Sequence, residues 1–159
     1  MRGAGKSMLG IRTRLAESVD IAPLVFFRIV AGTLIALETI GQVVTDYRDV
    51  YVGAELNFHY LLTPWLQPWS PPGVFVHFGF NIAAAIAVAA GYRTRLTAAA
   101  LGVGTLSLLL MEPSVYINHT YLYALTALLL CLTPCGEAIS LDVAAGRSSP
   151  RGSAPAWCL

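Results

Sequence analysis

Gly73–Gly91 reads GVFVHFGFNIAAAIAVAAG and contains no Asp, Glu, Lys or Arg. A helix that crosses the hydrocarbon core of a membrane needs about 20 predominantly apolar residues. Three further stretches have this character, namely Ile21–Thr45, Leu96–Met111 and Val115–Leu132. Lipid requires each backbone amide to be satisfied within its segment, and none of the stretches shows the period-two alternation of a barrel strand. The sequence therefore predicts an all-α integral membrane protein, a bundle of four transmembrane helices.

The composition excludes several other classes of protein. Of the 159 residues 56% are hydrophobic and 12% are charged, which excludes a disordered chain and is unusual for a soluble domain. The net charge of +1 provides no excess of positive charge for neutralising nucleic-acid phosphates. The three cysteines fit neither a disulfide framework nor the paired spacing of a zinc site. We therefore expect one membrane domain without a nucleic-acid partner or a metal site.

The distribution of positive charge predicts the orientation. With four crossings, the N-terminal tail, the turn at Arg93 and Arg95 and the C-terminal tail lie on one side, and Arg48 lies on the other. The positive-inside rule then places both termini in the cytoplasm. We expect a multi-pass protein of the cell membrane, here the bacterial inner membrane, with the loop Asp46–Pro72 outside and its Trp65 and Trp69 at the level of the headgroups.

Three regions follow from these spans. Residues 1–20 are predicted to be a cytoplasmic tail and residues 21–143 the four-helix membrane domain. Residues 144–159 are rich in Gly, Ser, Pro and Arg and are predicted to be a flexible linker that leads into the start of a further helix. Within the spans, small residues four apart predict close helix contacts. They are Gly32 and Ala36, then Ala83, Ala87 and Gly91, and finally Ala98 and Gly102.

Ionisable side chains within the spans are the first candidates for function, because they are costly in hydrocarbon. Arg28 lies in the cytoplasmic half of its helix and is expected to extend to the membrane surface. Glu38, His77 and His119 lie toward the outer side.

Helical spacing places His77 with Asn81, and His119 with Tyr123 and Thr126. These groups are predicted either to line an outward-opening pocket for a lipid-soluble ring or to hydrogen-bond one another across helices. A third interpretation is that His77 and His119 are the axial ligands of a b-type haem.

Several motifs, taken in order, resemble one family. They are Phe27-Arg28 with Gly32 and Glu38, Phe58-His59-Tyr60, Pro64-Trp65-Leu66-Gln67-Pro68, Gly91-Tyr92-Arg93-Thr94-Arg95, Glu112, Tyr116-Ile117-Asn118-His119-Thr120-Tyr121-Leu122-Tyr123 and Ser140-Leu141-Asp142. Over nearly the whole chain, this set resembles the membrane domain of vitamin K-dependent gamma-carboxylase and its bacterial relatives, the HTTM (horizontally transferred transmembrane) domain proteins. Ile117 departs from the animal enzymes, which have a second asparagine there.

The resemblance implies a membrane enzyme that oxidises a vitamin K hydroquinone and uses the resulting base to remove a glutamate γ-proton before CO₂ addition. It implies that Asn118 and His119 are catalytic. The family's reaction begins with a lysine on a helix after the Ser-Leu-Asp motif, whereas the only lysine of this sequence is Lys6.

We therefore expect the N-terminal part of an HTTM domain that is not catalytic by itself. We expect Glu38, His77, Asn81 and Tyr123 to contact a hydroquinone or related quinone. The expected partners are the lipid bilayer and either the remainder of the same protein or another membrane subunit. Two alternatives are a small non-catalytic subunit that binds a partner or a quinone, and a haem-binding subunit.

Overall fold

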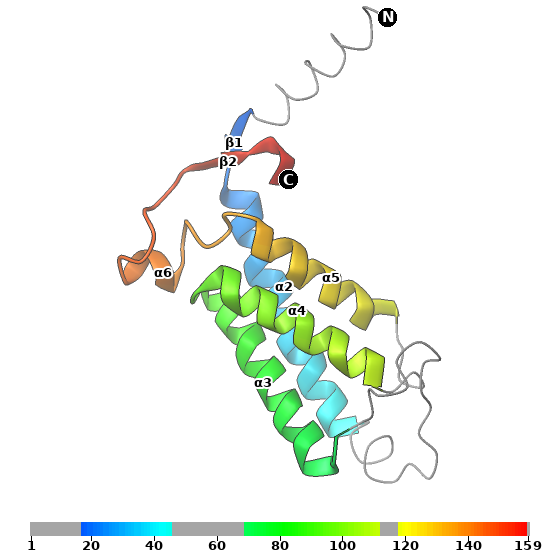
Figure 1. The fold of residues 1–159 in the computed structure, drawn as a ribbon. Coiled ribbons are helices and arrows are strands. Elements are labelled where there is room, and N and C mark those ends of the chain that lie inside the picture. The colour runs from blue at the N-terminus through cyan, green and yellow to red at the C-terminus, as the bar shows by residue number, and fades with distance from the viewer. Residues whose placement is uncertain (1–16, 46–68, 112–117, 159) are drawn as a thin grey trace, which may run out of the picture.

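The computed structural model describes residues 17–45, 69–111 and 118–158, and its main part is a bundle of four helices (Figure 1). These helices are α2 (Ala22–Thr45), α3 (Pro71–Ala90), α4 (Thr94–Met111) and α5 (Asn118–Leu132). The first three are long and apolar enough to cross a membrane, whereas α5 is an apolar helix of 15 residues. The predicted all-α bundle is confirmed, and its helices are compatible with a membrane domain. Residues 115–117 of the predicted fourth span lie outside the described residues.

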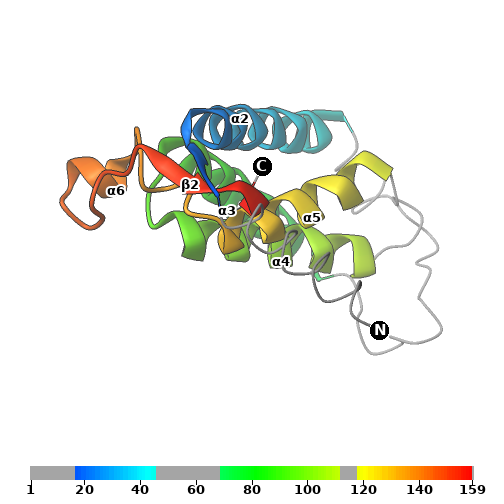
Figure 2. The ribbon, with the colours of Figure 1, turned by 90° about the horizontal axis from the view of Figure 1, so that it is seen from above.

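The helices run alternately up and down, so that their ends gather at two poles of the bundle (Figures 1 and 2). One pole holds the start of α2, the turn between α3 and α4, and the end of α5; we call it the arginine end. The other pole, the histidine end, holds Thr45, Pro71, Met111 and Asn118. Extensive contacts join α2 to α3, α3 to α4 and α4 to α5, whereas α2 and α5 touch over a much shorter stretch.

Local sequence explains where the helices begin and end. Pro71 and Pro72 occupy the first turn of α3, where a missing backbone N–H costs nothing. At the other end, Gly91 takes the left-handed conformation with φ 72°, and the Tyr92 N–H donates to the Ala87 carbonyl over 2.9 Å. Helix α5 ends at Leu132, two residues before Pro134, which cannot continue a helix.

Glycines allow two of the helix pairs to approach closely. A Cβ on Gly32 of α2 would lie 2.7 Å from the backbone nitrogen of Ala89 and 2.9 Å from the carbonyl oxygen of Ala85, both on α3. A Cβ on Gly102 of α4 would meet the Leu128 side chain of α5. The predicted role of small residues is therefore confirmed at Gly32 and Gly102.

Gly32→Ala is expected to lower the free energy of unfolding by about 1–3 kcal/mol, because the added methyl group forces backbone against backbone. The measurement is thermal or denaturant unfolding of the purified protein in detergent. Gly41→Ala is the matched control on the same helix, since nothing lies within 4 Å of its Cβ position. Alanine there should raise stability by up to about 1 kcal/mol through helix propensity. Equal effects at both glycines would contradict the close α2–α3 contact.

The outer faces of the bundle are covered by large hydrophobic side chains. They include Phe26, Leu37, Phe75, Val76, Leu122 and Leu129, each more than half exposed. So much exposed apolar surface on a small bundle is typical of helices that face lipid. Apolar helices and apolar outer faces together are consistent with embedding in a bilayer.

A short antiparallel sheet forms at the arginine end. Strand β1 (Ser18–Asp20) pairs with β2 (Ser153–Pro155), with Val19 opposite Ala154. Hydrogen bonds from Ile21 N–H to the Gly152 carbonyl and from Ala156 N–H to the Glu17 carbonyl extend the pairing. The backbone of residues 152–156 is thus paired, and Ala154 is buried. Residues Leu141–Ala144 form the short helix α6, and Ala156–Cys158 form the 3-10 helix η3.

Candidate functional site

Glu38 of α2 and His119 of α5 meet between the two helices, toward the histidine end of the bundle. His119 Nε2 lies 3.0 Å from Glu38 Oε1. The side chain of His119 is 44% exposed and that of Glu38 is 39% exposed, so the pair is open at one side. A carboxylate and an imidazole at this distance share a proton, whichever of the two carries it. The pair can therefore accept or donate a proton toward a third group.

Polar neighbours extend this junction along both helices. Gln42, one turn from Glu38, donates from Nε2 to Thr120 Oγ1 over 3.4 Å. The ring of Tyr123, one turn from His119, lies edge-on to the imidazole with the ring centroids 5.7 Å apart. Helical periodicity explains both placements, since residues four apart share a face. Asn118 is the exposed first residue of α5.

His77 belongs to a different helix contact. Its Nε2 lies 3.0 Å from the Gly104 carbonyl oxygen of α4 and 3.3 Å from Ser107 Oγ. Trp69 packs against the imidazole, with the ring centroids 5.2 Å apart. His77 is 8% exposed. It is thus engaged in a hydrogen bond across α3 and α4, which is one of the two uses expected for it.

Asn81 lies one turn after His77 on the same buried face of α3. It is 1% exposed, and its Oδ1 has no hydrogen-bond partner among the described residues. A Cβ on Gly104 would collide with this oxygen, so a glycine is needed for α4 to pass Asn81. Of the expected site residues, Glu38, His119 and Tyr123 are brought together between α2 and α5, whereas His77 and Asn81 face α4.

The haem interpretation finds no support in this arrangement. Axial ligation needs two imidazoles that face each other with a nitrogen directed to the iron. Here His77 Nε2 faces the Gly104 carbonyl of α4, and His119 Nε2 faces Glu38 of α2. The two histidines therefore serve different helix pairs.

Arg28 corrects one of our expectations. It does not extend to the surface but is 0% exposed, in the interior at the arginine end. Nη1 donates to the carbonyl oxygens of Cys135 at 2.6 Å and Ala138 at 3.4 Å, and Nη2 donates to that of Ile139 at 2.6 Å. These acceptors are available because the chain after Pro134 is not helical. Arg28 therefore ties α2 to the loop that follows α5.

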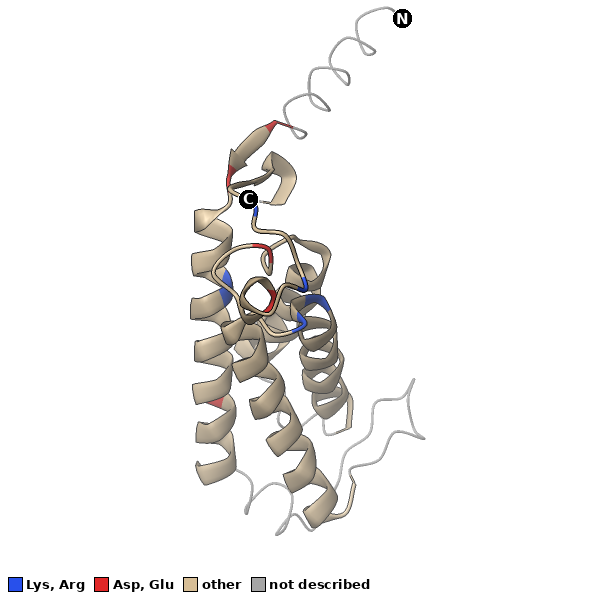
Figure 3. Ribbon diagram, turned by 90° about the vertical axis from the view of Figure 1, so that its left-hand side faces the viewer, with Lys and Arg blue, Asp and Glu red and all other residues tan. Residues whose placement is uncertain are grey.

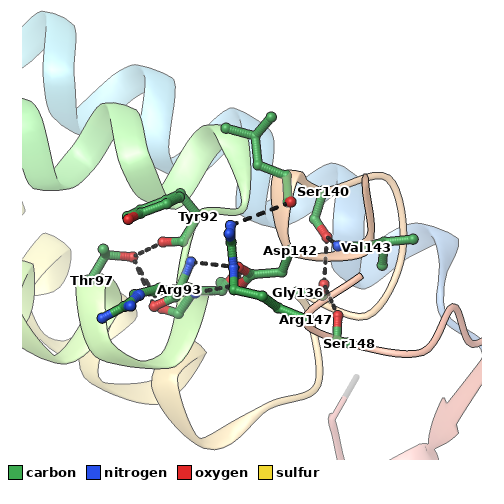
Figure 4. Close-up of polar contacts among 11 residues, drawn as sticks. Tyr92, Arg93, Thr97, Gly136, Ser140, Asp142, Val143, Arg147 and Ser148 are labelled. Atoms are coloured by element: carbon green, nitrogen blue, oxygen red, sulfur yellow. Dashed lines mark hydrogen bonds and ion pairs between the residues drawn. The ribbon is translucent and has the colours of Figure 1, made fainter. Parts of the chain in front are cut away.

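Asp142 organises the same end of the molecule (Figure 4). Its carboxylate accepts from the backbone N–H groups of Arg93 at 2.8 Å and Thr94 at 3.0 Å, and from Arg147 Nε at 2.9 Å. Its own N–H donates to the Gly91 carbonyl over 3.0 Å. Burial would raise the pKa of Asp142, but the two backbone hydrogen bonds and Arg147 together hold that pKa below its ordinary value.

The contacts of Arg28 and Asp142 form a group that we call the arginine-end cluster. This cluster contains Gly91 and two residues with unusual backbone conformations. A Cβ on Gly91 would lie 2.9 Å from Arg28 Nη1 and would also overlap Ser140. Arg93 and Ile139 have φ values of 44° and 43°, which non-glycine residues seldom adopt. The hydrogen bonds of Asp142 and Arg28 hold both of these residues in place.

The sequence contained a signal for this cluster. Gly91-Tyr92-Arg93-Thr94-Arg95 and Ser140-Leu141-Asp142 are two of the quoted motifs, and the structure brings them into direct contact. Spacing along the chain could not indicate this, since Asp142 lies 48 residues from Thr94. His59, Trp65, Glu112 and the other motif residues in 46–68 and 112–117 lie outside the described residues.

Comparison with known proteins agrees with the motifs. The sequence profile of the HTTM domain matches residues 16–159, and this domain suggests the membrane domain of the gamma-carboxylase family. No curated protein and no solved structure matched the chain. The profile match covers nearly the entire length of a chain that forms a bundle of apolar helices, and two of the quoted motifs meet in this bundle. The chain therefore belongs to the HTTM domain family.

Proposed function

We propose that this HTTM domain binds a lipid-soluble hydroquinone between α2 and α5, with the Glu38–His119 pair as hydrogen-bond and proton partner of a ring hydroxyl. The observation that carries the proposal is the 3.0 Å contact between these side chains, which is open at one side. A hydroquinone hydroxyl can donate to the carboxylate or accept from the imidazole. Tyr123 adds an aromatic edge beside the imidazole. Asn118, at the start of α5, is proposed to contact the same ligand.

The seam between α2 and α5 provides apolar room for such a ligand. An open cavity of about 340 Å³ lies on this seam toward the arginine end, lined mainly by apolar residues that include Pro23, Leu24, Phe27, Leu129 and Leu130. Phe27 and Glu38 are eleven residues apart, or about 16 Å along a helix. A hydroquinone that carries an apolar chain would then have its ring at Glu38 and its chain along the seam.

The domain is proposed to supply the binding pocket rather than the complete carboxylase reaction. The resemblance to the carboxylase implies a neutral lysine that deprotonates the hydroquinone, whereas Lys6 is the only lysine among the 159 residues. We propose that the reactive lysine comes from the remainder of the same protein or from another membrane subunit. We also propose that the arginine end faces the cytoplasm of a bacterial cell, because the arginines of the described residues gather there (Figure 3). Arg93, Arg95 and Arg147 line one cavity at this end, and Arg151 pairs with Glu137 beside it.

The test is the binding of 2-methyl-1,4-naphthohydroquinone to the protein in detergent, measured by anaerobic calorimetry. Glu38→Gln retains the size of the side chain and its contact with His119 but removes the carboxylate. We expect its dissociation constant to rise about tenfold, the effect of one lost hydrogen bond to a charged group. His119→Gln should have a similar effect, because the imidazole is lost while a hydrogen-bonding group remains.

Ser107→Ala is the matched control, because it alters the polar contact of His77 on α4 and leaves the α2–α5 junction intact. Its dissociation constant should remain within about twofold of the unmodified protein. Equal affinities for all four proteins would contradict the proposed site. A loss of affinity in Ser107→Ala alone would indicate that the hydroquinone binds beside His77 instead.

A further inference from the structure

A second cavity lies at the arginine end, outside the helix ends. Its volume is about 460 Å³, within the range of about 300–1,000 Å³ that is typical of ligand pockets. Three arginines line it, namely Arg93, Arg95 and Arg147, together with the polar side chains of Thr94, Ser148, Glu137 and Asp142. This cavity is separate from the α2–α5 junction, because it lies between the α3–α4 turn and the loop after α5.

Of the three arginines that line the cavity, one has no acidic partner among the described residues. The Asp142 carboxylate is already bound by two backbone N–H groups and Arg147. Glu137 is paired with Arg151 at 2.9 Å, and Arg95 Nη2 lies 4.0 Å away from it. Arg93 makes no ion pair with any residue that the structure describes, and its side chain is exposed at the cavity. The cavity therefore presents positive charge that the described part of the protein does not neutralise.

The position of the cavity decides which anion is available to it. Helix α4 begins at Thr94 and α5 ends at Leu132, and these helix ends border the cavity. In a bilayer the ends of spanning helices lie at the level of the lipid headgroups. Basic pockets between transmembrane helices at this depth are suited to anionic headgroups, whose phosphate accepts two parallel hydrogen bonds from a guanidinium group.

We propose that this cavity binds the phosphate of an anionic phospholipid, with Arg93 as its main contact. Arg147 remains on Asp142, with its guanidinium 4.9 Å from the centre of the Tyr92 ring, and forms the wall of the site. The lipid would cover the contact between the Gly91–Arg95 segment and the loop after α5, and would thereby stabilise the strained turn at Arg93.

Native mass spectrometry of the protein in detergent tests the proposal, with phosphatidylglycerol and phosphatidylcholine of identical chains as probes. We expect one phosphatidylglycerol to bind at least about tenfold more tightly than phosphatidylcholine, the effect of one charge-assisted contact. Arg93→Gln should remove this preference. Arg151→Gln is the matched control, because it also removes one positive charge, but from outside the lining, and Arg95 remains as the partner of Glu137. It should retain the preference within about twofold.

Two further measurements complete the test, one on the variant Arg93→Lys and one with glycerol 3-phosphate as the ligand. Arg93→Lys retains the charge and should retain part of the preference, which distinguishes lost binding from lost folding. Glycerol 3-phosphate carries the same phosphate without acyl chains and should bind far more weakly than the lipid. Equal binding of glycerol 3-phosphate would show that the site takes a soluble phosphate and would overturn the lipid assignment. Equal losses of the preference in Arg151→Gln and Arg93→Gln would show that only the overall surface charge matters, and would also overturn the proposal.

Discussion

Arg28→Met is expected to lower the free energy of unfolding by about 3–5 kcal/mol, the cost of removing one member of a buried polar cluster. Methionine retains apolar volume but donates no hydrogen bond. The carbonyl oxygens of Cys135, Ala138 and Ile139 would then lose their guanidinium partner in the interior. Thermal unfolding in detergent gives the size of the loss. Hydrogen exchange should show that protection falls first in residues 135–142, because their contact with α2 depends on Arg28.

Phe26→Met is the control for this change, since Phe26 is 69% exposed on the same helix and faces outward. Its stability should change by less than about 0.5 kcal/mol. Arg28→Lys adds a further comparison, because one ammonium group cannot reproduce the two nitrogens that serve three carbonyl oxygens. If Arg28→Met were as stable as Phe26→Met, the buried guanidinium would not hold the loop.

Asp142→Asn is expected to lower the free energy of unfolding by about 2–4 kcal/mol at neutral pH, through the loss of charge-assisted hydrogen bonds at a buried site. Asparagine retains one acceptor oxygen but directs an NH₂ group toward a donor. It therefore cannot accept from Arg93, Thr94 and Arg147 together. Denaturant unfolding at neutral pH measures the difference.

The stabilisation by the Asp142 carboxylate should also depend on pH in one direction. Because the folded-state pKa of Asp142 is lowered, its stabilisation is complete above the ordinary aspartate pKa of about 3.9 and is lost as the pH falls through the lower folded value. The gap in stability between the unmodified protein and Asp142→Asn should be constant from about pH 8 to about pH 5 and should shrink below about pH 4. A gap that widens in acid would contradict this assignment.

Arg147→Gln separates the ion pair from the backbone hydrogen bonds. The Arg147 side chain is 39% exposed, so its pair with Asp142 is partly screened by solvent. Its loss should cost no more than about 1 kcal/mol. A cost as large as that of Asp142→Asn would mean that the ion pair, rather than the bonds to Arg93 and Thr94, holds the turn.

The sequence was sufficient to predict the apolar helices and two of the glycines at which they pack closely. Long apolar stretches predict helices because lipid leaves the backbone no other partners, and this argument is local. Gly32 and Gly102 could be recognised from the four-residue spacing of small residues, because this pattern is also local in the sequence. The pairing of Ser18–Asp20 with Ser153–Pro155 could not, because two short strands far apart in sequence show no periodicity.

The candidate site was predictable in part. The cost of ionisable groups in hydrocarbon identified Glu38, His77 and His119 from the sequence alone. Helical periodicity fixed which neighbours share a face, such as His119 with Tyr123, but not which helix that face meets. The structure placed Glu38 with His119 and turned His77 toward α4. Whether this junction binds a hydroquinone stays a prediction.

Arg28 shows most clearly what could not be predicted from the sequence alone. From the sequence, an arginine near a helix end was expected to reach the surface, because that removes its charge from the hydrocarbon at little cost. The alternative became available only when the chain folded back after Pro134 and offered three carbonyl oxygens without helical partners. The sequence by itself thus determined which segments enter the membrane, since that choice depends on each segment alone. Only the tertiary structure decided which buried polar groups meet, since each needs a partner that is distant along the chain.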